Sequence, residues 1–131
     1  MFTQKEFKPA GYTSASPYFV VRGAKKFIDL LTKLFGATEQ RSYKREDGSI
    51  MHAEVKLDDS IIMIAEATEN FPGNTILMHV YVPNVDETYK RALELGCDKI
   101  QEPVQKEGDP DKRGGFRDFA GNDWYVSTQT V

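Results

Sequence analysis

Several residue types are scarce in this chain of 131 residues, and each scarcity excludes a class of protein. The single cysteine, Cys97, excludes an internal disulfide, a CxxC redox pair and a zinc site built on several cysteines. No segment comes near the roughly eighteen consecutive apolar residues that a membrane-spanning helix needs. The net charge of −3 mixes both signs, so it gives no electrostatic reason to bind nucleic acid.

The rest of the composition is typical of one folded domain. Hydrophobic residues make up 40% of the chain and aromatic residues 11%, which argues against intrinsic disorder. The amino-terminal residues 1–11 mix acidic and basic side chains around no apolar centre, so we expect no secretory signal. We therefore expect a single domain over residues 1–131, a cytoplasmic location, and neither a nucleic-acid nor a membrane partner.

Hydrophobic periodicity and turn residues predict two helices and eight short strands. The helices are expected at residues 24–35 and 85–95, and each is followed by a glycine that can end it, Gly36 or Gly96. The strands are expected at residues 16–21, 38–43, 50–57, 60–65, 76–82, 99–104, 116–118 and 123–128. The polar, glycine-rich residues 105–115 should form a mobile loop that could serve as a lid.

Two halves of the chain therefore carry the same order of elements. After an irregular lead-in at residues 1–13, both halves predict a strand, a helix and three strands, over about residues 14–67 and 75–129. Such a repeat indicates an α+β fold of two βαβββ modules. Because neither half is long enough to cover its own sheet, the two should join in one body. An accidental match of element order is the alternative.

Alternate side chains divide each predicted strand into two faces. One face is apolar and fits beneath the helices, with Phe19, Val55 and Trp124 among its members. The other face mixes rings with polar groups, as expected of a sheet that lines a small-molecule pocket. A half-solvated sheet whose polar face binds nothing is the alternative. The mixed face carries Tyr18, His52, Glu54, Met63, Leu77, His79, Tyr81 and Tyr125.

Two smaller patterns on or near this face point to chemistry. His52 and Glu54 lie two residues apart on one strand, and with His79 they make a possible two-histidine, one-carboxylate metal triad. Either histidine could instead act as a general base, because imidazole titrates near neutral pH. Arg117 could clamp an anionic ligand with its planar guanidinium, or it could pair with its neighbour Asp118.

Several segments resemble the vicinal oxygen chelate superfamily, which includes glyoxalase I, bleomycin-resistance proteins and extradiol dioxygenases. The similarity extends over nearly the whole chain from about residue 12, and it is strongest to small glyoxalase-like proteins without an assigned reaction. It implies a cupped, eight-stranded mixed sheet with helices on the outer face, and commonly a dimer. The segments are Pro17–Ala24, Met51–Val55, Ser60–Met63, and Phe116–Asp118 with Gly121 and Trp124.

The resemblance also implies four metal-ligand positions, one on each of four strands. In this chain they fall on Ser16, Met63, Leu77 and Tyr125. These side chains do not form the nitrogen and oxygen shell that a hard or borderline divalent cation requires. We therefore expect no metal and no other cofactor, although His79 lies two residues beyond Leu77.

The leading hypothesis is a homodimeric, metal-free pocket protein that binds a small, partly aromatic organic molecule. The alternative is a metal-dependent lyase, isomerase or dioxygenase with a rearranged site, in which His52, Glu54 and His79 are the catalytic candidates. A dimeric scaffold whose pocket has no ligand is the third hypothesis. The residues expected to contact a ligand are Tyr18, His52, Glu54, Met63, His79, Tyr81, Arg117 and Tyr125.

Overall fold

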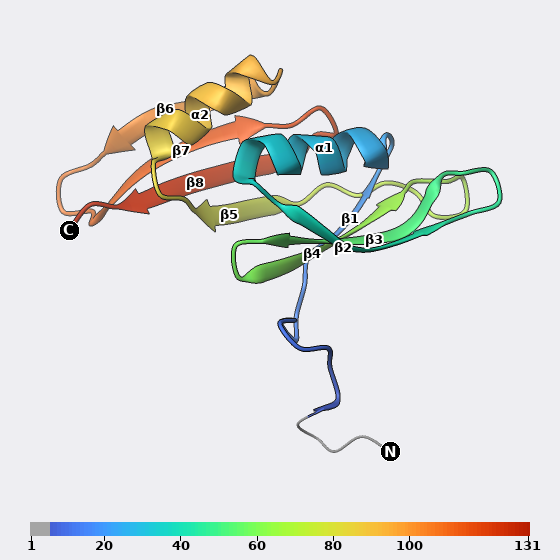
Figure 1. Cartoon of the computed structure of the whole chain (residues 1–131). Helices are drawn as coiled ribbons and strands as arrows, with labels where there is room; N and C mark the ends of the chain where they lie inside the picture. The colour runs from blue at the N-terminus through green and yellow to red at the C-terminus, as the bar shows by residue number, and fades with distance from the viewer. Residues whose placement is uncertain (1–5) are drawn as a thin grey trace. The chain divides into compact units, whose positions relative to one another are not determined.

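The computed structural model describes residues 6–131, so the first five residues of the predicted lead-in lie outside the described part. A strand, a helix and three strands follow one another twice along the chain, which confirms the predicted repeat (Figure 1). The elements are β1 (Tyr18–Val21), α1 (Ala24–Phe35), β2 (Thr38–Lys44), β3 (Ile50–Leu57), β4 (Ser60–Glu66), β5 (Leu77–Tyr81), α2 (Val85–Glu94), β6 (Asp98–Gln105), β7 (Asp111–Arg117) and β8 (Asp123–Gln129).

The eight strands form two mixed sheets of four strands with the same topology. The strand orders are β1-β4-β3-β2 and β5-β8-β7-β6. In each sheet the first and last strands of the repeat pair in parallel, and the remaining pairs are antiparallel. The α+β class with two βαβββ modules is therefore confirmed. Contacts divide the chain into two compact units, one up to residue 32 and from 36 to 73, the other of residues 33–35 and 74–131.

In the first unit, α1 is amphipathic and buries its apolar side. The Phe27 ring of α1 packs on Phe19 of β1, with ring centroids 5.0 Å apart. Full burial of such a ring contributes about 1.5–3 kcal/mol to folding. Gly36 ends the helix in the left-handed conformation. At the other end no side chain of α1 caps the helix, and the Glu66 carboxylate of β4 accepts hydrogen bonds from the backbone N–H of Gly23 and Ala24 instead.

In the second unit, α2 begins at Val85, as predicted, and the side chain of the preceding Asn84 accepts a hydrogen bond from the backbone N–H of Glu87. The helix packs along β6, β7 and β8 (Figure 1). Phe116 of β7 and Trp124 of β8 are direct cross-strand neighbours, and both are fully buried. Most side chains of the predicted apolar faces are thus buried in both units, whereas Met51, on the same face of β3 as Val55, is 49% exposed.

The predicted mobile loop at residues 105–115 is wrong in part, because residue 105 ends β6 and residues 111–115 belong to β7. The glycines that suggest a loop are needed for close packing inside the sheet. A methyl group at Gly114 would lie 3.2 Å from Cγ of Pro103, and one at Gly115 would lie 2.9 Å from the ring of Tyr125. Glycine is used here because another chain segment approaches the backbone closely.

A buried carboxylate fixes the connection between β7 and β8. Asp118 is 3% exposed, and one of its oxygens accepts hydrogen bonds from the backbone N–H of Ala120 and Asn122. Its other oxygen accepts the indole N–H of Trp124 at 2.8 Å. The loop is thereby bound to Trp124, the largest buried side chain of the second unit, and this contact helps to fix the register between β7 and β8.

We predict that Asp118→Asn lowers the free energy of unfolding by about 1–3 kcal/mol. The substitution keeps the side-chain shape but places an amide donor against a backbone or indole donor, and a buried donor loses its acceptor. Urea unfolding followed by tryptophan fluorescence measures the change. Asp59→Asn, in the exposed turn between β3 and β4, is the matched control and should change stability by less than about 0.5 kcal/mol. An equal change in the two variants would contradict the role assigned to Asp118.

Candidate functional site

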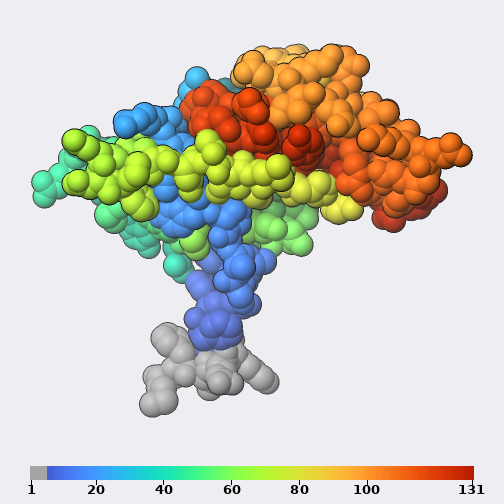
Figure 2. All heavy atoms as spheres, turned by 180° about the vertical axis from the view of Figure 1, so that it is seen from behind, coloured from blue at the N-terminus to red at the C-terminus, as the bar shows by residue number. Residues whose placement is uncertain are grey.

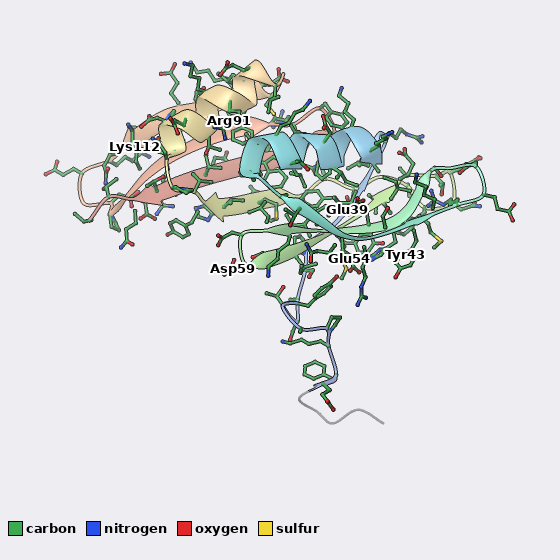
Figure 3. All side chains as sticks on the ribbon, in the orientation of Figure 1. Glu39, Tyr43, Glu54, Asp59, Arg91 and Lys112 are labelled. Carbon is green, nitrogen blue, oxygen red and sulfur yellow. The ribbon has the colours of Figure 1, made fainter. Side chains whose placement is uncertain are left out.

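The strand register of the first unit brings four side chains into one row on the mixed face of its sheet. Tyr18 of β1 lies beside Met63 of β4, Met63 beside Glu54 of β3, and Glu54 beside Arg41 of β2. His52 is two residues before Glu54 on β3 and shares this face. Four of the predicted ligand contacts, Tyr18, His52, Glu54 and Met63, are thus brought together. Figure 3 shows Glu54 and Tyr43 on the side of the sheet that the lead-in approaches.

A continuous hydrogen-bonded chain joins three of these side chains. The Tyr18 hydroxyl lies 2.7 Å from Nδ1 of His52, and Nε2 of His52 lies 2.8 Å from Oε2 of Glu54. An ionised carboxylate only accepts hydrogen bonds, so Nε2 of His52 carries a proton and donates to Glu54. In the neutral imidazole Nδ1 is then the acceptor, and the Tyr18 hydroxyl donates to it. The geometry therefore assigns the direction of the bond to Glu54, and that of the bond to Tyr18 for the neutral ring.

Glu54 is the centre of this cluster, and it is 5% exposed. Burial raises its pKa, but hydrogen bonds from Tyr12 and His52 together with nearby positive charge outweigh burial, so the pKa lies below the ordinary value. Arg41 adds to this effect, with its Nε 3.7 Å from Oε1 of Glu54. Burial and the negative charge of Glu54 raise the pKa of Tyr18. The cluster thus holds one buried negative charge and a phenol that keeps its proton.

Tyr12 and Arg41 are members of this cluster that the sequence did not reveal. The Tyr12 hydroxyl donates to Oε1 of Glu54, and the Arg41 guanidinium lies 5.2 Å from the centroid of the Tyr12 ring. Tyr12 belongs to the irregular lead-in, where no strand periodicity assigns it a face. Arg41 is on the edge strand β2, whose residues are all exposed, so its alternation carries little signal.

The second unit carries a corresponding group on the mixed face of its own sheet. His79 of β5 lies directly beside Tyr125 of β8, and Tyr81 lies beside Ser127. Nε2 of His79 is 2.9 Å from Oγ of Ser127. The Tyr81 hydroxyl donates to Asp111 at 2.7 Å. The predicted contacts His79, Tyr81 and Tyr125 therefore share one face.

A pocket of about 360 Å³ opens on this face. Tyr125 forms part of its floor, because its ring lies over the backbone of Gly115, where no side chain intervenes. Ser127 is fully buried below the pocket and lies 3.4 Å from Nη1 of Arg113. Asp109 and Asp111 in turn hold Arg113. The lining residues are His79, Gln101, Val104, Lys106, Asp109, Arg113, Tyr125 and Ser127.

Arg117 makes a different ion pair from the one that the sequence suggested. Its Nε lies 2.6 Å from Oδ1 of Asp123, and its Nη2 lies 3.2 Å from Oδ2. The neighbouring Asp118 is buried with Trp124 and Asn122 and accepts nothing from Arg117. Strand pairing decides this partner, because Arg117 and Asp123 are register neighbours across β7 and β8. Arg117 does not line the pocket, and its role in ligand binding stays a prediction.

Comparison with known proteins gives fold relatives at low sequence identity. No protein-family model matches the chain. The uncharacterized protein Mb0911c of Mycobacterium bovis is 25% identical over 120 residues, which cover 83% of this chain and 78% of that protein. The structure of TioX from Micromonospora sp. ML1 is 20% identical with a TM-score of 0.68, and the match covers 89% of this chain and all of TioX.

Two further solved structures carry informative names. The fosfomycin resistance protein FosX of Listeria monocytogenes is 18% identical with a TM-score of 0.65, over 91% of this chain and 94% of FosX. A glyoxalase/bleomycin resistance protein/dioxygenase family enzyme of Burkholderia phytofirmans PsJN is 15% identical with a TM-score of 0.68, over 86% of this chain and 95% of that enzyme. The chain has the vicinal oxygen chelate fold.

In this chain, the four positions at which the resemblance implies metal ligands carry other side chains. Met63 lies between Tyr18 and Glu54, and Leu77 is 69% exposed beside Asp123. The strand neighbour of Tyr125 is His79 rather than Leu77. Within residues 6–131, no three His, Cys, Asp or Glu side chains lie close enough together to hold a metal ion. The donor set therefore does not fit a divalent cation.

No helix in this part of the chain is long and apolar enough to cross a membrane.

We predict that the imidazole of His79 titrates below the ordinary histidine pKa of 6.5. Burial lowers its pKa, and the positive charge of Arg113 lowers it further against the opposing effect of Asp111. Because the unfolded chain then binds the proton more tightly, the contribution of neutral His79 to stability is complete above pH 6.5. It is lost as the pH falls through the folded-state pKa.

Two-dimensional NMR of the histidine rings over a pH series measures this pKa. The chain has two histidines, so the spectrum of His79→Asn assigns both signals. Arg113→Gln should raise the pKa of His79, since it removes the nearby positive charge. A pKa at or above 6.5 in the unsubstituted protein would contradict the prediction.

Proposed function

We propose that this protein binds a small organic molecule without a metal ion, in the pocket of the second unit. The observation that carries the proposal is the pocket of about 360 Å³ with Tyr125 on its floor and His79 on its wall. Its volume lies in the range of small-molecule sites, which combine apolar area with a few polar groups that orient the ligand. Both residues were expected to contact a ligand on strand alternation alone.

The chemistry of the lining supports a planar, partly aromatic ligand. Tyr125 offers a ring face for stacking, and Val104, which is 41% exposed, adds apolar surface. His79, kept neutral by its lowered pKa, and the amide of Gln101 can each donate and accept hydrogen bonds. Lys106 adds a positive charge to the lining. Such a site can select a ligand by shape and hydrogen bonding.

Binding without metal chemistry is supported by the side chains at the expected ligand positions. A hydroxyl, a thioether, an isobutyl group and a phenol stand at Ser16, Met63, Leu77 and Tyr125. A metal-dependent lyase, isomerase or dioxygenase would need a different donor set. Sequestration of a harmful compound needs affinity alone, and resistance to fosfomycin and bleomycin appears in the names of proteins with this fold.

A thermal-shift screen with small aromatic fragments tests the proposal. A ligand that binds only the folded state at about 100 times its Kd adds about 2.7 kcal/mol to the free energy of unfolding, which raises Tm by several degrees. Tyr125→Ala should abolish the shift of every hit. Phe119→Ala, which removes an exposed ring outside the pocket lining, should retain it. The proposal fails if no fragment raises Tm, or if both variants lose the shift equally.

Gly115→Ala should weaken binding of a confirmed hit by about tenfold while the pocket keeps all of its side chains. The added methyl group would lie 2.9 Å from Cδ1 and Cε1 of Tyr125, so the ring must move away from the strand. Isothermal titration with Gly115→Ala and with the unsubstituted protein measures the ratio. Unchanged affinity would show that the position of the Tyr125 ring does not control binding.

Elemental analysis of protein purified without chelator tests the metal-free part of the proposal. We expect less than about 0.1 equivalent of any divalent transition metal, because the expected positions lack carboxylate and imidazole ligands. A stoichiometric ion that His52→Ala and His79→Ala both remove would support the metal-dependent alternative instead.

Two further expectations belong to the same proposal: a dimer, which the resemblance implies, and a cytoplasmic location, which the composition and the amino-terminal residues suggest. We propose that the chain forms a homodimer and resides in the cytoplasm. Sedimentation velocity at micromolar concentration measures the mass. A species at the monomer mass of 14.9 kDa would remove the dimer from the proposal and leave ligand binding unaffected.

A further inference from the structure

Glu54 and Arg41 contact the side chain of Tyr12 on the first sheet. The site that this side chain fills, called here the seat of Tyr12, has the chemistry of a phenol-binding site. Its hydroxyl donates to the buried carboxylate of Glu54, and the Arg41 guanidinium lies 5.2 Å from the centroid of its ring. A charge-assisted hydrogen bond to the hydroxyl and a cation against the ring are two independent elements of recognition. The hydrogen bond to Glu54 is also the largest cause of the raised pKa of Tyr12.

The lead-in that carries Tyr12 is otherwise in solvent. Among residues 6–15, Tyr12 alone is partly buried, and the other nine are exposed. A turn at Gly11, which has a positive φ of 82°, directs Tyr12 at the sheet, and the Tyr12 N–H donates to the carbonyl of Pro9. Figure 2 shows the described lead-in in dark blue, standing out from the first unit as a narrow stalk. The Tyr12 ring therefore anchors a mostly exposed segment to this part of the sheet.

We propose that the seat of Tyr12 is a binding site for small phenolic molecules, which the protein's own lead-in fills. The ligand class follows from the contacts that Tyr12 makes, since its side chain is chemically 4-methylphenol. A tethered group competes at an effective concentration in the millimolar range, so a free phenol meets strong competition in the resting protein. The inference concerns residues outside the pocket of the proposed function and does not depend on it.

The hydrogen bonds that orient Glu54 explain why the seat of Tyr12 is polar. Oε1 of Glu54 accepts from the phenol, while Oε2 accepts from His52, which is also hydrogen-bonded to Tyr18. Each member of the chain thus has its partner, and the carboxylate lies in a fixed orientation before a phenol arrives. A ligand that replaces the Tyr12 ring completes the same network, whereas one without a hydroxyl leaves Oε1 of Glu54 with Arg41 alone, at 3.7 Å.

Tyr12→Ala in the full-length protein tests the proposal with 4-methylphenol as the probe and toluene as its counterpart without the hydroxyl. We expect the variant to bind 4-methylphenol with a Kd of about 1 mM or tighter. The unsubstituted protein should bind it about two- to tenfold more weakly, because Tyr12 competes at a millimolar effective concentration. Shifts of the His52 ring signals, followed by NMR during titration, report binding beside Glu54. Circular dichroism verifies that the variant is folded.

Two further variants distinguish binding at the seat of Tyr12 from binding elsewhere. Arg41→Met in the Tyr12→Ala background removes the cation from an exposed strand without disturbing the core, and it should weaken binding about two- to fivefold. Tyr43→Ala is the matched control, because it removes a half-exposed tyrosine that stacks on His52 without occupying the seat. It should create no site.

Three outcomes would overturn the proposal: no binding to folded Tyr12→Ala, toluene binding as tightly as 4-methylphenol, or Tyr43→Ala gaining the same affinity. None of these results bears on the pocket beside Tyr125, where the fragment screen reports through Tyr125→Ala. Failure of one proposal therefore leaves the other standing.

Discussion

Parallel pairing of the first and last strands in each repeat decides which side chains meet on the mixed faces. Tyr18 lies beside Met63 and His79 beside Tyr125 because β1 pairs with β4 and β5 pairs with β8 in these registers. A shift by one residue would send every polar group into the apolar layer beneath the helices, at a large desolvation cost. The buried aromatic core and the candidate sites are therefore two consequences of one register.

The two repeats use this common geometry for different chemistry. In the first unit a buried carboxylate, Glu54, collects donors from the lead-in and from two strands. In the second unit the corresponding face is more open, with a pocket whose charged groups mostly neutralise one another around Arg113. The first unit thus offers a preorganised hydrogen-bond acceptor, the Glu54 carboxylate, and the second unit offers a pocket lined by the Tyr125 ring.

Glycine has a packing role in this fold that composition alone disguises. Gly114 and Gly115 suggest a mobile loop, since glycine weakens strands in general. In β7 they instead allow Pro103 and the Tyr125 ring to approach the backbone, and the ring then becomes the floor of a pocket. Whether a glycine makes a segment flexible or allows another side chain to pack against the backbone depends on the residues around it.

Hydrophobic periodicity and turn residues were sufficient to predict the element order, the end of the first helix at Gly36, and the two faces of most strands. Those features follow from local spacing and the need to bury apolar surface. Tertiary structure decided the partner of Arg117, the packing of Gly115 and the arrival of Tyr12 at Glu54. These contacts join residues distant in the chain or lacking a periodic pattern, so their distances depend on strand register and chain path.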